Sequence, residues 1–303
     1  MTATAPAAGL ADLHRHLDGS LRATTLAELA AAAGRGVPDD IRFFPNMGLD
    51  AALARFEVTL SVLQTTTAVT RVAREICEDA AADGVTTLEI RFAPQLHGNT
   101  PAAIVDAALA GINGRAGLIL CGLYGEDPAV LSSLVDIARD RPGVVGIDLA
   151  GGPTPGHSWA MTDYAPAFRA AAELGLGRTV HAGEGRPAAE IRTAIEALVA
   201  QRIGHGTTLL DDPEVLELVV SAGITIEACP TSNVHTGVIS DVSEHPLATW
   251  LAEGVRTCVC PDNTLLSDVS ASAELARVVT ALGLDDAQRA TLIANGHAGA
   301  FAR

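Results

Sequence analysis

The sequence predicts an α/β fold, namely a (β/α)8 barrel of the TIM type with extra helices between its first and second strands. Eight short apolar runs of strand length alternate with helical patterns along the 303 residues, which is the order of elements in such a barrel. No G-x-G-x-x-G motif follows the first run, and this disfavours a doubly wound dinucleotide-binding sheet. No Pro/Ser/Gly-rich linker divides the chain, so we expect a single domain over residues 1–303.

The candidate strands are apolar runs that have the length of buried strands and are followed by turn or helix signals. They are residues 11–17, 86–94, 117–124, 143–151, 177–184, 202–207, 225–233 and 256–263.

The helical patterns lie between these runs, and several begin with Asp or Thr before Pro and end at Gly. The stretch from 22 to 85 holds three helical segments instead of one, and we expect it to form a lid. Phe56 and Leu60 stand one turn apart in it and form an apolar stripe. The stripe either packs in the core or covers a bound ligand.

The composition excludes several classes of protein. With 36 acidic and 20 basic residues the net charge is −16, which repels phosphate backbones and favours small neutral or weakly charged partners over nucleic acid. We expect neither a membrane span nor a signal peptide, because no long apolar run or basic N-terminal region is present, and we therefore expect a cytoplasmic protein. The five cysteines include no C-x-x-C pair, so we expect no disulfide bonds.

Two histidines, His14 and His16, end the first candidate strand. In an extended strand they point to the same face, where they could bind one metal ion. Taken alone, the pattern is better explained by one histidine in the core and one that caps a turn. Catalytic groups of such barrels come from the carboxyl ends of the strands, however, and the ends of later strands add further polar residues, namely His181, Glu184, His205 and Asp262.

Three imidazoles and one carboxylate are a suitable ligand set for zinc or a similar divalent ion, with one position left for water. His205 is placed to act as the general base that makes this water a usable nucleophile. Glu184, three residues after His181, could protonate the substrate atom that gains electrons. These groups together indicate metal-assisted hydrolysis.

Seven segments in this order resemble motifs of the adenosine deaminase branch of the metal-dependent amidohydrolases: LHRHLDGSLR, LEIRFAP, GIDLAG, TVHAGE, RIGHGT, EACPTSN and CPDNTLLSD. The resemblance extends from about residue 10 to 275. It implies one zinc ion per chain, held by His14, His16, His181 and Asp262.

The resemblance also implies roles for single residues. Glu184 would protonate purine N1, and His205 would orient or deprotonate the water that attacks C6. Asp18 would contact the ribose 5′-hydroxyl, Gly151 would offer its backbone N–H to purine N3, and Asn263 would face N7.

Three segments differ from the usual family pattern. Cys260-Pro261-Asp262-Asn263 stands in place of N-T-D-D or N-T-D-N, and Pro261 either re-aims Asp262 or makes it more rigid. Gly152-Pro153 replaces Asp-Glu after the fourth strand, and Leu123-Tyr124-Gly125 stands where an Arg-His pair is commoner. These differences leave open a substrate other than plain adenosine.

The leading hypothesis is zinc-dependent hydrolytic deamination of adenosine or a related 6-aminopurine nucleoside, with release of ammonia. A rival keeps the metal and the fold but acts on a modified or 5′-substituted purine such as an aminodeoxyfutalosine, on a free base or on another aminated heterocycle. A second rival is a catalytically weakened barrel that only binds a nucleoside or a protein. All four candidate ligands and both acid–base residues are present, which disfavours this second rival. The sequence does not indicate an oligomeric state.

Overall fold

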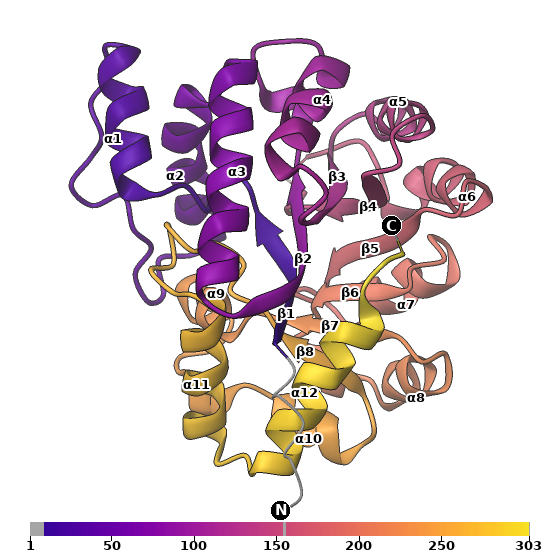
Figure 1. The fold of residues 1–303 in the computed structure, drawn as a ribbon. Coiled ribbons are helices and arrows are strands. Elements are labelled where there is room, and N and C mark those ends of the chain that lie inside the picture. Colours follow the sequence, from indigo (N-terminus) through magenta and orange to yellow (C-terminus); the bar gives the residue numbers. More distant parts are fainter. Residues whose placement is uncertain (1–8, 154–155, 303) are drawn as a thin grey trace, which may run out of the picture.

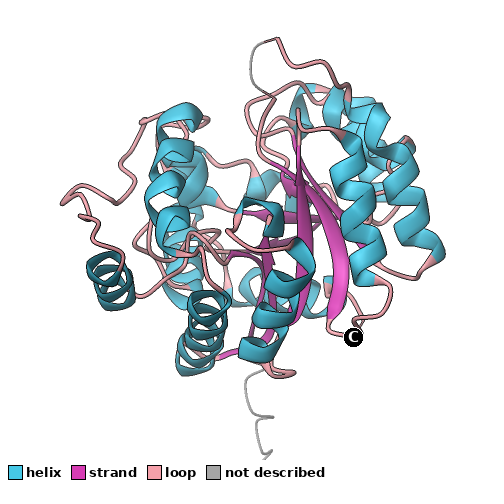
Figure 2. Cartoon of the chain, turned by 90° about the horizontal axis from the view of Figure 1, so that it is seen from above, coloured by secondary structure: helices cyan, strands magenta, loops and turns pink. Residues whose placement is uncertain are grey.

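The computed structural model describes residues 9–153 and 156–302. Residues 1–8, which carry part of the expectation about a signal peptide, lie outside the described residues, as do Thr154 and Pro155 of the loop after the fourth strand. Figures 1 and 2 show strands in the interior and helices around them, as predicted for a (β/α)8 barrel.

The eight strands are parallel neighbours in chain order, from β1 to β8, in one sheet that curves into a nearly closed barrel. Their bounds are β1 Leu10–His16, β2 Val85–Phe92, β3 Gly117–Leu123, β4 Val144–Ala150, β5 Gly177–Ala182, β6 Arg202–His205, β7 Thr225–Ala228 and β8 Arg256–Val259. All eight predicted strands are present.

The seam between β1 and β8 is closed by a bridge between Arg15 and Asp262. The N–H of His16 donates to the carbonyl of Asp262 (2.9 Å), and the N–H of Asp262 donates to the carbonyl of His14 (3.1 Å). The backbone hydrogen bonds that close the barrel therefore place Asp262 beside both histidines of the first strand.

The α-helices cover the outside of the barrel, and three of them lie between β1 and β2, as predicted. Their bounds are α1 Ala23–Ala32, α2 Leu49–Val62, α3 Thr66–Ala82, α4 Pro101–Ile112, α5 Pro128–Ala138, α6 Ala165–Glu173, α7 Ala189–Glu196, α8 Pro213–Ser221, α9 Pro230–His235, α10 Leu247–Ala252, α11 Ala271–Leu282 and α12 Asp286–Gly299.

The predicted strand at 225–233 is too long. Only Thr225–Ala228 is extended, and Pro230 begins the short helix α9. Proline is well placed at the first helical position, because its missing N–H has no helical partner there. Similarly, β8 ends at Val259, so Asp262 lies in the turn after the strand and not within it.

The C-terminal residues close the other end of the barrel. Helix α12 packs against β1 and β8 and leads the chain end towards β5 (Figure 1). The ring of Phe301 lies 3.7 Å from the guanidinium carbon of Arg202. It also rests on Gly177, where an added Cβ would lie 2.1 Å from the ring, so only glycine fits there. The aromatic ring thus covers a buried cation of β6.

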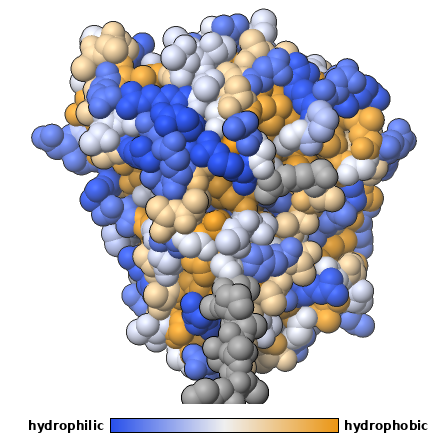
Figure 3. All heavy atoms as spheres, viewed as in Figure 1, coloured by the Kyte–Doolittle hydropathy of each residue, from blue (hydrophilic) through white to orange (hydrophobic). Residues whose placement is uncertain are grey.

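Hydrophilic side chains gather over the side of the molecule formed by α1 to α3 (Figure 3). The arginines there are paired with acids, as in Arg22–Asp79 (2.7 Å) and Arg74–Glu78 (2.7 Å), so they form no purely positive surface. In the described part of the chain, no helix combines the length and apolar character needed to cross a membrane. The five cysteines are free and buried.

Candidate metal centre and substrate cavity

A cavity opens at the carboxyl ends of the barrel strands, where the sequence places the candidate site residues. Eight of the nine line this cavity, namely His16, Asp18, Gly151, His181, Glu184, His205, Asp262 and Asn263. The ninth, His14, is fully buried beneath it. The structure therefore brings together residues from the ends of five strands, of which β4 contributes only the backbone of Gly151.

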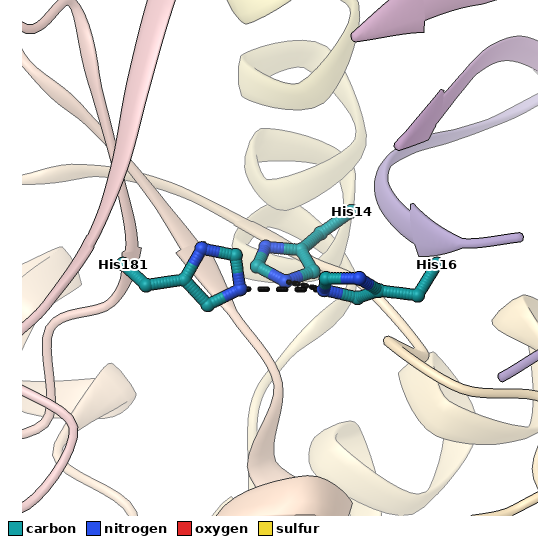
Figure 4. A group of neighbouring side chains, drawn as sticks. All are labelled: His14, His16 and His181. Carbon is teal, nitrogen blue, oxygen red and sulfur yellow. Dashed lines mark hydrogen bonds between the residues drawn. The ribbon is translucent and has the colours of Figure 1, made fainter. Parts of the chain in front are cut away.

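Three imidazole rings converge at the base of the cavity (Figure 4). The Nε2 atom of His16 lies 3.3 Å from Nε2 of His14 and 3.3 Å from Nε2 of His181. The carboxylate atom Oδ1 of Asp262 lies 3.4 Å from Nε2 of His16 and 3.7 Å from Nε2 of His14. Nε2 of His16 thus lies within 3.4 Å of the other three donor atoms.

The opposite ring nitrogens of two of these histidines are held by buried carboxylates. Nδ1 of His14 lies 2.7 Å from Oε2 of Glu227, and Nδ1 of His181 lies 3.1 Å from Oδ2 of Asp148. A carboxylate at Nδ1 fixes the ring proton there and leaves the lone pair of Nε2 directed at the point where the rings converge. This is the usual support of a metal-ligating histidine.

The donor set fits a divalent ion such as zinc. Four donors that surround a zinc ion tetrahedrally at about 2.0–2.1 Å lie roughly 3.3 Å from one another, which agrees with the separations at His16. Burial, followed by the charges of Arg91 and the other imidazoles, lowers the pKa of His14 well below its ordinary value. A neutral imidazole is the form that binds a metal.

The two carboxylates behind the histidines belong to a buried network of charges. Arg91 donates to Asp148 (2.8 Å) and to Glu227 (2.7 Å), and Arg202 donates to the other oxygen of Glu227 (2.6 Å). Burial alone would raise the pKa of Glu227, but the two guanidinium groups hold it below its ordinary value. Glu227 is therefore ionised and accepts the ring proton of His14.

His205 and Asp262 have left-handed backbone conformations, with φ of 67° and 63°. Residues with a Cβ adopt such angles rarely and at some cost, and they do so most often at functional sites. The unusual backbone turns both side chains into the cavity at the ends of β6 and β8. Pro261, whose effect on Asp262 the sequence left open, directly precedes this left-handed position.

Glu184 and His205 are neighbours on the wall of the cavity. Oε1 of Glu184 lies 3.7 Å from Nδ1 of His205. Burial raises the pKa of the Glu184 carboxyl, which favours the protonated form that a general acid needs. Burial, followed by the charge of His181, lowers the pKa of His205 to about 3.

The other end of the polar wall carries Asp18 and Asn263. Oδ1 of each is buried and has no hydrogen-bond partner within the described part of the chain. Burial raises the pKa of Asp18 to about 7. Asn263 packs directly on Gly19, where an added Cβ would lie 1.8 Å from Oδ1. These free oxygens can accept hydrogen bonds from a ligand, as expected for Asp18, whereas a hydrogen bond to the acceptor N7 would have to come from Nδ2 of Asn263.

The opposite wall of the cavity is apolar and comes from the segment between β1 and β2. Phe56 and Leu60 of α2 line it, together with Phe43 and Leu49. The Phe56 ring centre is 6.3 Å from that of His16. The apolar stripe predicted on this segment thus faces the cavity, which supports its interpretation as a lid.

The segments that differ from the usual family pattern reach the cavity only in part. Leu123 lines the cavity, whereas the Tyr124 ring turns away to contact His157 at 5.5 Å. Gly152 lies against Nη1 of Arg186, 3.0 Å from where its Cβ would be. His157 is not among the lining residues described.

Sequence reasoning missed the residues that support the site from behind, namely Asp148, Glu227, Arg91 and Asn233. Asp148, Glu227 and Arg91 are charged residues within buried strands, at 0% exposure. A charged residue in an apolar strand is rare unless it is paired, so these positions carried a usable signal. Asn233 carried no such signal, because it was assigned to a strand that is a helix.

Comparison with known proteins gives matches over nearly the whole chain. Residues 9–303 match the model of the adenosine deaminase family. The adenosine deaminase of Enterococcus faecalis is 33% identical, over 96% of this chain and 91% of that protein. A probable adenosine deaminase of Dictyostelium discoideum is 38% identical over 87% of this chain, which spans only 36% of that longer protein.

The fold also has solved counterparts. An N6-mAMP deaminase from Arabidopsis has a TM-score of 0.86 and 27% sequence identity, and the match covers 98% of this chain and 94% of that one. Of the three proteins just named, two have names that refer to a nucleoside and the third has a name that refers to a nucleotide.

Proposed function

Because this chain belongs to the adenosine deaminase family and is a hydrolytic deaminase, we propose that it acts on adenosine or a related 6-aminopurine nucleoside that lacks a 5′-phosphate. We propose zinc as the assisting ion, one per chain, held by the cluster of His14, His16 and His181 and by Asp262, whose Oδ1 lies 3.4 Å from Nε2 of His16.

The lack of permanently cationic side chains in the described lining of the cavity carries this proposal. No arginine lines the cavity there, and the chain contains no lysine. Oδ1 of Asp18 is buried without a hydrogen-bond partner among the described residues and would accept from the sugar. A phosphate dianion in such a site would lose its hydration without gaining a cationic partner. A neutral 5′-hydroxyl, in contrast, can donate a hydrogen bond to Asp18.

When it is bound, the ion would make a water molecule a usable nucleophile at neutral pH. The water oxygen adds to C6 of the purine, and the electron pair of the C6–N1 double bond moves to N1. Glu184 gives its proton to N1 as this bond forms, and its raised pKa keeps that proton available. His205, whose Nδ1 lies 3.7 Å from Oε1 of Glu184, would hydrogen-bond the attacking water.

The second half of the reaction breaks the bond between C6 and the exocyclic nitrogen. The first proton of the water passes through a carboxylate of the site and restores the acid form of Glu184. The second proton goes to the amine, which leaves as ammonia, and the oxygen stays on C6 as a carbonyl. Asn263 and the backbone N–H of Gly151 would hold the ring through N7 and N3. The apolar side chains of α2 cover the base and exclude bulk water from the site.

We predict that the zinc-loaded protein releases ammonia from adenosine with kcat/KM at least roughly 100-fold above that for AMP, the penalty of an unpaired buried charge. Ammonia release is measured for adenosine, AMP, N6-methyl-AMP, adenine and 5′-substituted adenosines. Preference for AMP would contradict the argument from the absence of arginine and lysine side chains in the described lining. Preference for adenine or a 5′-substituted analogue would favour the first rival hypothesis.

We predict that Asp18→Ala raises KM for adenosine about 5- to 100-fold and changes kcat little, because a hydrogen bond to the sugar is equally strong in ground and transition states. 5′-Deoxyadenosine lacks the hydroxyl, so its KM should be the same for the variant and the wild-type protein. The exposed Asp40, paired with Arg55 away from the cavity, gives a control variant, Asp40→Ala. Equal losses for both nucleosides would place Asp18 in the support of the metal instead.

A further inference from the structure

His205 is held from behind by one buried side chain. Asn233 of α9 is fully buried, and its Nδ2 atom lies 3.2 Å from Nδ1 of His205. The carboxylate of Glu184 is farther from Nδ1, at 3.7 Å, which exceeds hydrogen-bond distance. Among the described residues, the Asn233 amide is thus the hydrogen-bond partner of this ring nitrogen.

The backbone around Asn233 fixes the position of the amide. Its N–H donates to the carbonyl of Cys229 (3.0 Å), and its carbonyl accepts from the N–H groups of Val238 (2.9 Å) and Ile239 (3.3 Å). The side chain is not needed to cap α9, which Pro230 begins. The amide is therefore free to hold the imidazole in one orientation.

The direction of this hydrogen bond decides which nitrogen of His205 carries the proton. An amide nitrogen only donates, so Nδ1 of the ring must accept, and in a neutral imidazole the proton is then on Nε2. We propose that Asn233 fixes His205 in the Nε2–H tautomer, so that His205 donates a hydrogen bond to the attacking oxygen and does not take its proton. This inference rests on the proposed function, and it makes Asn233 a positioning residue of the deamination.

A donor at this place suits the charge that develops in the reaction. As the water loses a proton the oxygen becomes more negative, and a hydrogen bond donated to it strengthens towards the transition state. The proton then passes to a carboxylate. Asp262 is suitably placed among the described acids, because a carboxylate oxygen lies within 4.8 Å of a ring nitrogen of His14 and of His205.

The tautomer is read directly from nitrogen–proton correlation spectra of zinc-loaded protein that carries 15N-labelled histidine. The chain has nine histidines, so His205→Gln identifies the resonances of His205. We expect the proton on Nε2 in the wild-type protein. A proton on Nδ1 would overturn the proposal, whether or not the protein deaminates adenosine, whereas absence of deamination alone would contradict only the proposed function.

Asn233→Asp reverses the hydrogen bond, because a carboxylate accepts from Nδ1–H and leaves Nε2 without a proton. We expect the proton to move to Nδ1 and kcat to fall roughly 10- to 100-fold, with KM within about threefold of wild type, as expected for lost stabilisation of a developing charge. Asn295→Asp is the matched control, since Asn295 donates to the carbonyl of Thr257 outside the cavity. Zinc content and thermal unfolding are compared for all variants.

A double-mutant cycle separates the route through His205 from a general effect on the fold or on Glu184. In the His205→Gln background, Asn233→Asp should lower kcat no further. A loss that persists in this background, or a single variant with kcat within twofold of wild type, would overturn the proposal. If Asn233→Asp does not fold, the spectrum of the wild-type protein still decides it.

Discussion

Replacing Glu184 with glutamine is expected to lower kcat for adenosine by roughly two to four orders of magnitude, the usual value of a positioned proton transfer. Glutamine is nearly isosteric but has no acidic proton for the ring nitrogen. The carboxyl group lies in the cavity wall, where burial raises its pKa and so favours the protonated form that the reaction needs. Zinc content and KM should change little, because Glu184 is not among the four expected ligands.

Glu126→Gln is a suitable control for this experiment. Glu126 is also a partly buried carboxyl with a pKa raised by burial, but it bonds Gln95 and does not appear in the described lining of the cavity. The control should retain full activity. If Glu184→Gln turned over adenosine at close to the wild-type rate, the proton-transfer mechanism would be wrong and a non-catalytic nucleoside-binding protein would regain support.

Removing two of the expected metal ligands should have a comparably large effect. For the double variant His14→Ala/His16→Ala we expect zinc affinity to fall by more than the roughly 10- to 100-fold that is lost when only a residue hydrogen-bonded to a metal ligand is removed. The reason is that two of the four expected donors are gone and the buried carboxylate of Glu227 loses the imidazole of His14, one of its hydrogen-bond partners. Deamination should fall below detection.

Zinc affinity is measured by competition with a chelator, and metal content by elemental analysis. His157→Ala provides the control, because His157 is a histidine of the loop after β4 that does not appear in the described lining of the cavity. A wild-type protein that cannot be loaded with one equivalent of zinc or a similar metal would contradict the proposed site. A double variant that retains wild-type metal affinity would do the same.

Most of the architecture could be predicted from the sequence because the signals are local. Buried parallel strands appear as short apolar runs, and prolines and N-capping residues mark the helices between them. The error at 225–233 has an equally local cause. The apolar run of β7 continues into Cys229, and only the proline after it starts a helix, so run length alone overestimates the strand.

The site was predictable to the extent that its residues follow the ends of strands. His181, Glu184 and His205 all have this position, and they meet in the structure because the carboxyl ends of parallel strands lie together. Glu227 and Asn233 could not be found in this way. They act through other side chains across the barrel, and a single sequence does not show which distant residues become hydrogen-bond partners.

The closure of the barrel at Asp262 has a consequence for the making of the protein. The strand that carries His14 and His16 is the first to leave the ribosome, but its neighbour across the seam is encoded almost at the other end of the chain. The proposed metal site therefore cannot be complete until synthesis has passed β8, and until then the edge of β1 that faces β8 is unpaired. An ion that binds only the finished barrel would stabilise the contact between β1 and Asp262, which forms last. Completed chains would then unfold less often and be exposed less to chaperones and proteases.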